Sequence, residues 1–279
     1  MTTIFKDIIN EVLSIADIVD KKSDAIKKAI LDNTNTIEWH NDNYEPTIKY
    51  KTNSFDTNLL ADLNPNIKHI SYNYVYFPDE QMYRKYHDTL LDKGSYVNNN
   101  IFSIEFASIN GNILVSEFEG SIYHELEHLY QIKKAQENYI LKNGRYRLAL
   151  RFLNDEDSDL SILANFIYLT SKPELDANIN GLYAYLKKYK PETILKFMNS
   201  PVVYNEKYYI DFYYKQVMEL NDNSASFKVF QVDKNWCMNR YKKTTDYLIN
   251  KLGKIYTRHL TFEAKFNPYF RKPVPKYLI

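Results

Sequence analysis

Cysteine and glycine are scarce in this chain, and their scarcity excludes several classes of protein. The one cysteine among 279 residues, Cys237, cannot form an intrachain disulfide, so a small disulfide-stapled scaffold is excluded. The 6 glycines are too few for a collagen-like or linker-like chain. No glycine-rich phosphate loop, Rossmann fingerprint or G-x-S-x-G elbow is present, which removes ATP, NAD and serine-hydrolase chemistry.

An excess of one charge and long apolar runs are also missing. Lys and Arg number 36 against 35 Asp and Glu, so the formal net charge is +1 and no general field attracts nucleic acid or an anionic membrane. No apolar run approaches the roughly 18 to 20 residues that cross a bilayer, and charges interrupt the amino-terminal stretch too often for a signal peptide. We therefore expect a cytoplasmic or intravirion protein that has neither nucleic acid nor a membrane as its partner.

The overall composition is typical of a globular protein. Its composition is 44% hydrophobic, 25% charged and 15% aromatic, and its length suffices to bury a large core. The pattern of elements predicts one α+β domain over residues 1–279. Its expected parts are amino-terminal helices and strands (1–95), a central core (96–190), a helical part (191–265) and an extended, proline-containing tail (266–279).

Apolar periodicity places the main elements of this domain. Helical spacing over residues 4–31 predicts one long helix or two, and helical spacing from 121 to about 252 predicts a helical carboxyl-terminal half. Residues 68–77 alternate as a strand and residues 80–91 return to helical spacing, while 33–65 is expected to be loop with one short strand at 48–50. Asn110-Gly111 lies between two β-rich runs and predicts a hairpin over 101–119, because both residues tolerate the positive φ of a type I′ turn.

One pentapeptide carries the strongest chemical signal: His124-Glu125-Leu126-Glu127-His128, an H-E-x-x-H motif. Two histidines four residues apart lie on the same face of a helix, so both imidazoles can bind one tetrahedral metal ion. The glutamate after the first histidine reaches water on that ion without binding the metal itself. The motif therefore predicts a zinc site in which Glu125 is the catalytic general base.

The sequence around the motif has the two faces that such a helix needs. On a helical projection the two histidines share one side with Ser121 and Gln131. The opposite, core-facing side holds Ile122, Leu126, Leu129 and Tyr130. The competing interpretation is a pair of surface histidines in a charged helix, which would have no reason to follow a β-hairpin directly.

A catalytic zinc needs a third protein ligand, and Glu174 is the first candidate. It begins a helix in which it shares a face with Ala177, Asn178 and Gly181, whose small side chains allow a close approach to another helix. Asn178 is expected to hydrogen-bond a zinc-bound histidine and fix its ring. In the competing interpretation, Ser171 and Glu174 form an S-x-x-E capping box that only starts the helix. The alternative third ligands are, in order, Asp176, Glu156 and His259.

The hairpin, the HELEHLYQ helix and the ELDAN helix together resemble the small gluzincin core of the ImmA/IrrE-type metallopeptidases and related phage and bacterial zincins. The resemblance covers roughly residues 101–186 and implies zinc bound by His124, His128 and Glu174, with Glu125 as general base, in a chain encoded by a bacterium or a phage. It also implies that one hairpin strand forms an edge to which an extended peptide adds by β-augmentation. The first hundred residues lack the helix-turn-helix of some relatives, and the long helical part after residue 190 departs from the family pattern.

The expected reaction is hydrolysis of a peptide bond in a peptide or protein substrate. Zinc lowers the pKa of its bound water toward about 7, and Glu125 accepts the proton and passes it to the leaving amine. The developing negative oxygen needs a hydrogen-bond donor, for which we select His259, with Tyr123 and Tyr130 as further candidates. The competing interpretation of His259 is an exposed histidine in a basic carboxyl-terminal stretch.

Two alternatives to a peptidase remain open at this point. A zincin-like scaffold without catalysis would serve in binding, as a phage or host-interaction protein. A structural zinc would have four protein ligands and no position for water. Replacement of Glu125 distinguishes the first alternative, because an enzyme would keep its zinc and lose its turnover.

Overall fold

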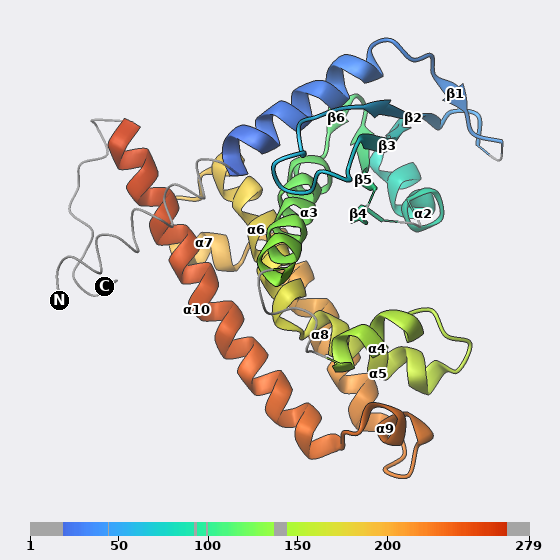
Figure 1. The fold of residues 1–279 in the computed structure, drawn as a ribbon, viewed down its shortest axis with the longest axis vertical. Helices are drawn as coiled ribbons and strands as arrows, with labels where there is room; N and C mark the ends of the chain where they lie inside the picture. Colours follow the sequence, from blue (N-terminus) through green and yellow to red (C-terminus); the bar gives the residue numbers. More distant parts are fainter. Residues whose placement is uncertain (1–18, 44, 92–93, 99, 137–143, 267–279) are drawn as a thin grey trace. The chain divides into compact units, whose positions relative to one another are not determined.

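The computed structural model describes residues 19–43, 45–91, 94–98, 100–136 and 144–266, and it has the predicted α+β class (Figure 1). The chain divides into two compact units. Unit 1 comprises Met1–Asn143 and Asp176–Ala184, and unit 2 comprises Gly144–Leu175 and Tyr185–Ile279. The sequence predicted one continuous domain, whereas here one helix of the second half contributes residues to both units.

Unit 1 contains a mixed β-sheet. Its strands are β1 (His40–Asn41), β2 (Lys49–Asp56), β3 (His69–Phe77), β4 (Tyr96–Val97), β5 (Ile101–Ile109) and β6 (Asn112–Ile113). The order across the sheet is β1-β2-β3-β5-β4, and β6 also pairs with β5. The long central strands β3 and β5 are parallel, and the chain crosses from one to the other through helix α2 (Glu80–Leu90). The predicted strand over 68–77 and helix over 80–91 are thereby confirmed.

Helices cover both faces of the central strands. One face presents Tyr74 and Phe106, and it packs against a helix over residues 19–34 and against α3 (Val115–Gln136). Phe106 stacks on Tyr74 at 4.6 Å and on Phe118 of α3 at 4.1 Å between ring centroids, so aromatic contacts hold α3 to the sheet. The other face presents Val75, Phe77 and Ala107 to α2. Residues 4–18 of the predicted first helix lie outside the described residues.

The hairpin prediction is correct at its turn and wrong in its second strand. Asn110 and Gly111 have φ of 50° and 79°, as a type I′ turn requires. The strand after the turn ends at Ile113, and α3 begins at Val115. Residues 115–119 are helical because Val115 and Phe118, three residues apart, are both buried. The predicted short strand at 48–50 is in fact the longer β2, which is stabilised by antiparallel pairing with β3 along its whole length.

Unit 2 is helical, as the periodicity predicted. Its helices are α4 (Gly144–Phe152), α5 (Ser158–Leu169), α7 (Ile194–Met198), α8 (Pro201–Glu219), α9 (Ala225–Phe230) and α10 (Lys234–Phe266), and α6 (Lys172–Tyr189) contributes to both units. Phe166, Val217, Phe227 and Cys237 belong to its buried core. The tail over 267–279 lies outside the described residues. Among the helices described here, none combines the length and the apolar character needed to span a membrane.

Candidate metal centre

Helix α3 places the two motif histidines against each other. The Nε2 atoms of His124 and His128 lie 3.1 Å apart, and the two ring planes are inclined at 80°. The opposite stripe of α3, which includes Ile122, Leu126 and Leu129, is fully buried in the core under the sheet. The predicted separation of the histidine face from a core face is therefore confirmed.

A pair of glycines lets α6 approach α3 closely. A Cβ atom built on Gly181 of α6 would lie 3.1 Å from the carbonyl oxygen of Gly120 in α3, and one built on Gly120 would lie 3.5 Å from the carbonyl oxygen of Gly181. Gly120 precedes His124 by one helical turn, and Gly181 follows Glu174 by two turns on the same face. Because a helix is rigid over one or two turns, we expect the glycine contact to determine how far Glu174 lies from the histidine pair.

Glu174 joins the histidines, as the sequence predicted. One ligand atom from each of His124, His128 and Glu174 lies within 4.8 Å of the other two, and the Glu174 side chain is buried. The competing capping box is not formed: the Ser171 hydroxyl makes no capping bond, and the backbone N–H of Ser171 donates to the carbonyl oxygen of Tyr168 at 2.9 Å. The alternative ligands Asp176, Glu156 and His259 are not members of this group.

The three residues fit a zinc ion in chemistry and in spacing. Two imidazole nitrogens and a carboxylate are the donor set of many catalytic zinc sites. Zinc–nitrogen bonds of about 2.0–2.1 Å at tetrahedral angles place two ligand nitrogens about 3.3 Å apart, close to the 3.1 Å between the two Nε2 atoms. Three protein ligands leave the fourth position of a tetrahedral ion for water, which is the arrangement of a catalytic site.

Glu125 lies beside this group without belonging to it. Its carboxylate oxygen Oε1 is 3.8 Å from Nε2 of His124, and its side chain is almost completely buried. On α3 it occupies the flank between the buried stripe and the histidine face. A carboxylate beside the three candidate ligands, but not one of them, is where a general base for a metal-bound water would have to lie.

A series of hydrogen bonds extends from His128 to other side chains of α3 and α6. Nδ1 of His128 lies 3.1 Å from Oε1 of Gln131, one turn further along α3. The Gln131 amide nitrogen donates to Oε1 of Glu127 at 3.5 Å, and Asn180 of α6 donates to Oε2 of Glu127 at 2.7 Å. The sequence placed Gln131 on the ligand face without assigning it this role. The role of Asn178, a partly buried residue of α6, stays a prediction.

The sequence missed one acid near Glu174. Glu206 of α8 is partly buried, and burial together with the charge of Glu174 raises the pKa of its carboxyl to about 7. The two residues are 32 positions apart in the chain, so no sequence motif predicts that they lie close together. A carboxyl group with this pKa is about half protonated at pH 7, so Glu206 can both give and take a proton beside Glu174.

The candidates for the oxyanion donor have different surroundings. His259 is buried on α10, so the interpretation of an exposed histidine is wrong, and its proposed role stays a prediction. Tyr123 is committed to another partner, because its hydroxyl donates to the Asp20 carboxylate at 2.5 Å. Burial and the neighbouring Asp20 raise the pKa of Tyr123 far above its ordinary value. Tyr130 lies at the edge of the core, with a pKa raised by burial.

The gluzincin resemblance implies that a hairpin strand offers a free edge to a peptide, but strand β5 of the hairpin is already paired on both sides. Opposite β3, β4 pairs with Phe102 and Ser103, and β6 pairs with Ser108 and Ile109. Between them the Ser95 hydroxyl accepts from the backbone N–H of Glu105 at 2.9 Å. Within the described residues, an extended peptide would therefore have to displace β4 and Ser95 before it could pair with β5.

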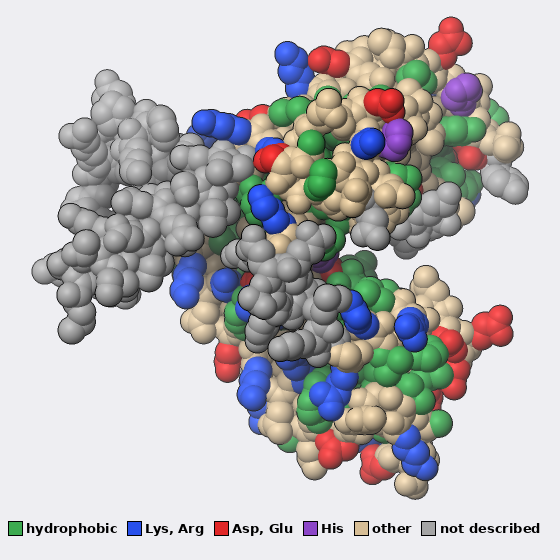
Figure 2. Space-filling view, viewed as in Figure 1, with side chains coloured by type: hydrophobic (Ala, Val, Ile, Leu, Met, Phe, Trp, Pro, Cys, Tyr) green, Lys and Arg blue, Asp and Glu red, His purple; other side chains and the backbone are tan. Residues whose placement is uncertain are grey.

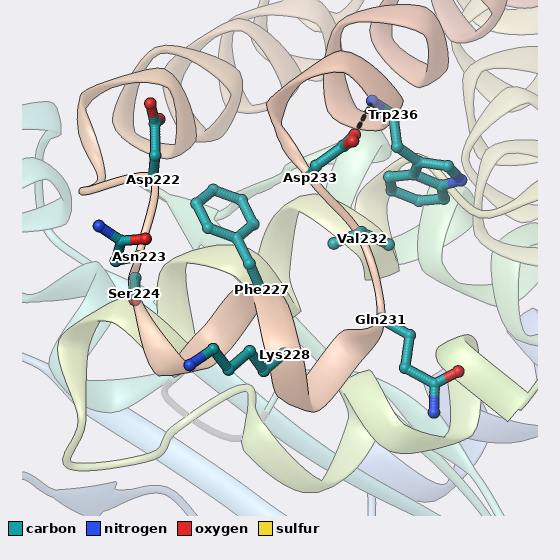
Figure 3. A pocket seen from close by; sticks show the side chains of 9 residues that line it. All are labelled: Asp222, Asn223, Ser224, Phe227, Lys228, Gln231, Val232, Asp233 and Trp236. Atoms are coloured by element: carbon teal, nitrogen blue, oxygen red, sulfur yellow. Dashed lines mark hydrogen bonds between the residues drawn. The ribbon is translucent and has the colours of Figure 1, made fainter.

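A separate hollow in unit 2 has a different character. It is an open depression of about 550 Å³ beside α9 and the start of α10. Its nine lining residues, which include Asp222, Lys228, Asp233 and Trp236, contain no histidine or cysteine (Figure 3). The Asp233 carboxylate accepts a hydrogen bond from the backbone N–H of Trp236 at 2.6 Å, so this acidic residue of the hollow caps the start of α10. On the visible face of each unit, acidic and basic side chains are interspersed (Figure 2). The histidine and glutamate group on α3 and α6 remains the candidate centre.

Comparisons of the chain with protein-family models, with curated proteins and with solved structures found no match. The resemblance of residues 101–186 to the gluzincins therefore stays a prediction, and the motif and the geometry of the site are what support it.

Proposed function

We propose that this protein is a zinc-dependent metallopeptidase whose metal is held by His124, His128 and Glu174. The observation that carries the proposal is the convergence of these three side chains, within 4.8 Å of one another, from two helices that cross at a glycine contact. Glu125 adds a buried carboxylate 3.8 Å from one imidazole. Three ligands and an adjacent base are what hydrolysis by a metal-activated water requires.

Each residue of the proposed site has a defined task in this reaction. The two imidazoles and Glu174 bind the metal. When bound, zinc supplies a water of lowered pKa and polarises the peptide carbonyl. The Glu125 carboxylate would take a proton from that water as its oxygen adds to the peptide carbonyl carbon, and would give the proton to the amine nitrogen when the C–N bond breaks. His259, or another donor close to the developing oxyanion, stabilises its charge.

The first test is metal content. Protein purified without chelator or nickel resin is expected to contain one zinc per chain by elemental analysis. Glu174→Ala should lose most of this zinc, whereas Glu156→Ala and Asp176→Ala, which replace the alternative ligands, should keep it. A wild-type protein free of metal that also fails to bind added zinc would contradict the proposal.

The second test is turnover on unfolded protein substrates. Glu125→Gln removes the base while leaving an amide of equal size, so it should keep zinc and lower turnover by at least about 100-fold. Glu80→Gln, the same exchange at an exposed position of α2, is the matched control and should keep full activity. Zinc-loaded wild type without hydrolysis of any substrate would instead favour the scaffold, and the proposal of a peptidase would be abandoned.

A further inference from the structure

We propose that Glu127 and Gln131 act in series as positioning residues that fix the tautomer of His128, so that its Nε2 lone pair faces the metal position. Glu127 occupies one of the two variable positions of the H-E-x-x-H motif, to which the motif itself assigns no task. The inference rests on the proposed function for its purpose, while its physical content concerns the chain alone.

The direction of each hydrogen bond follows from the carboxylate. Both carboxylate oxygens of Glu127 accept hydrogen bonds from amides, Oε2 from Asn180 and Oε1 from Gln131, so the Gln131 amide turns its NH₂ group toward Oε1 of Glu127, 3.5 Å away. The amide oxygen of Gln131 is then directed at Nδ1 of His128, at 3.1 Å. An amide oxygen also only accepts, so Nδ1 of His128 carries the hydrogen. In a neutral imidazole this leaves the lone pair on Nε2, the atom that faces His124.

Helix α6 anchors the start of this series. Asn180 donates its amide hydrogen to Oε2 of Glu127 at 2.7 Å, so the two carboxylate oxygens of Glu127 are used by two different helices. Asn180 is adjacent to Gly181, whose backbone lies close to that of Gly120 in α3. The helix contact that positions Glu174 therefore also holds the carboxylate that orients His128, and both kinds of metal ligand depend on the same packing.

The first experiment measures the tautomer without any metal. In EDTA-treated protein with ¹⁵N-labelled histidine, at about pH 8, where imidazoles of ordinary pKa near 6.5 are neutral, the two ring nitrogens of His128 have distinct shifts. We expect a protonated Nδ1 and an unprotonated Nε2 in the wild type. Gln131→Met, which keeps the side-chain length without hydrogen bonds, should shift His128 toward the Nε2–H form that imidazole side chains favour in water. Gln81→Met, at an exposed position of α2, is the matched control.

The result that overturns the inference is equally direct. It fails if wild-type His128 carries its proton on Nε2, or if Gln131→Met leaves the tautomer unchanged in a folded protein, as checked by circular dichroism. This outcome is independent of the proposed function. If wild-type His128 has the Nδ1–H form but the protein binds no zinc, the inference about the tautomer stands and the proposed metallopeptidase function is refuted.

Zinc affinity tests the serial arrangement. Loss of an outer partner of a ligand histidine costs about 10- to 100-fold in metal affinity, so Gln131→Met should weaken zinc binding by at least about 10-fold in a chelator competition. Glu127→Gln frees the Gln131 amide to flip and should weaken binding less. Because Glu127 acts through Gln131, Glu127→Gln should have no further effect in the Gln131→Met background. Additive losses in the double variant would show two independent contributions and refute the series.

Discussion

Replacing Gly181 by alanine tests whether the close approach of α6 to α3 builds the metal centre. Two changes in free energy oppose each other in this variant. Alanine in a helix interior is favoured over glycine by about 1 kcal/mol. The new Cβ, however, would lie 3.1 Å from the backbone carbonyl oxygen of Gly120, and a backbone atom cannot rotate away. Overpacking of this kind costs about 1–3 kcal/mol, so the net expectation is a destabilisation of up to about 2 kcal/mol.

Gly120→Ala is the matched control, because it makes the same exchange on the other side of the same contact. Its Cβ would lie 3.5 Å from the carbonyl oxygen of Gly181, which is an ordinary van der Waals distance. It should therefore keep the gain in helix propensity and stabilise the protein by up to about 1 kcal/mol. The two variants, identical in composition, should then differ in free energy of unfolding by about 1–3 kcal/mol.

The assay has two readouts that the structure connects. Urea unfolding of the metal-free proteins gives the difference in stability. Chelator competition gives the zinc affinity, which should fall several-fold in Gly181→Ala because α6 must move by a few tenths of an ångström and carry Glu174 away from the imidazoles. If Gly181→Ala is as stable as Gly120→Ala and binds zinc equally well, the glycine contact does not determine the site and this reasoning is refuted.

Two further predictions concern groups whose pKa the fold shifts. Burial and Glu174 raise the pKa of Glu206 to about 7 from 4.5, so in the metal-free chain this group's contribution to stability is complete below about pH 4.5 and is lost as the pH rises through about 7. Glu206→Gln should therefore reduce the difference in free energy of unfolding between pH 5 and pH 8, measured with EDTA present, and equal differences in both proteins would contradict the assignment. Burial raises the pKa of the Cys237 thiol to about 12 from 9.0, so a disulfide reagent at about pH 8 should react with it only after unfolding. Because of this group, the free energy of unfolding should fall by at most about 1.4 kcal/mol per pH unit between about pH 9 and pH 12. The Cys237→Ala variant should lack this contribution to the pH dependence. Rapid labelling of the thiol in the native protein would contradict its burial.

The sequence was informative wherever a feature depends on neighbours along the chain. The opposed faces of α3 follow from residue spacing within one helix, so the histidine pair and the buried stripe of Ile122, Leu126 and Leu129 were predicted correctly. The same is true of the turn at Asn110-Gly111, because two residues with positive φ decide its geometry. Local backbone preferences were insufficient for β2, whose polar alternation has little strand character without its partner β3.

By itself, then, the sequence determined the α+β class, the helix that carries the two imidazoles and the acid expected to complete their set. These depend on apolar periodicity and motif spacing, which are properties of short segments. Only the tertiary structure decided that α3 begins at Val115, that a glycine pair lets α6 approach α3 closely, that Glu206 lies near Glu174, and that Asn180 donates to Glu127. The reason is that side chains distant in sequence meet through helix packing, and the separation of two packed helices depends on the particular residues at their crossing.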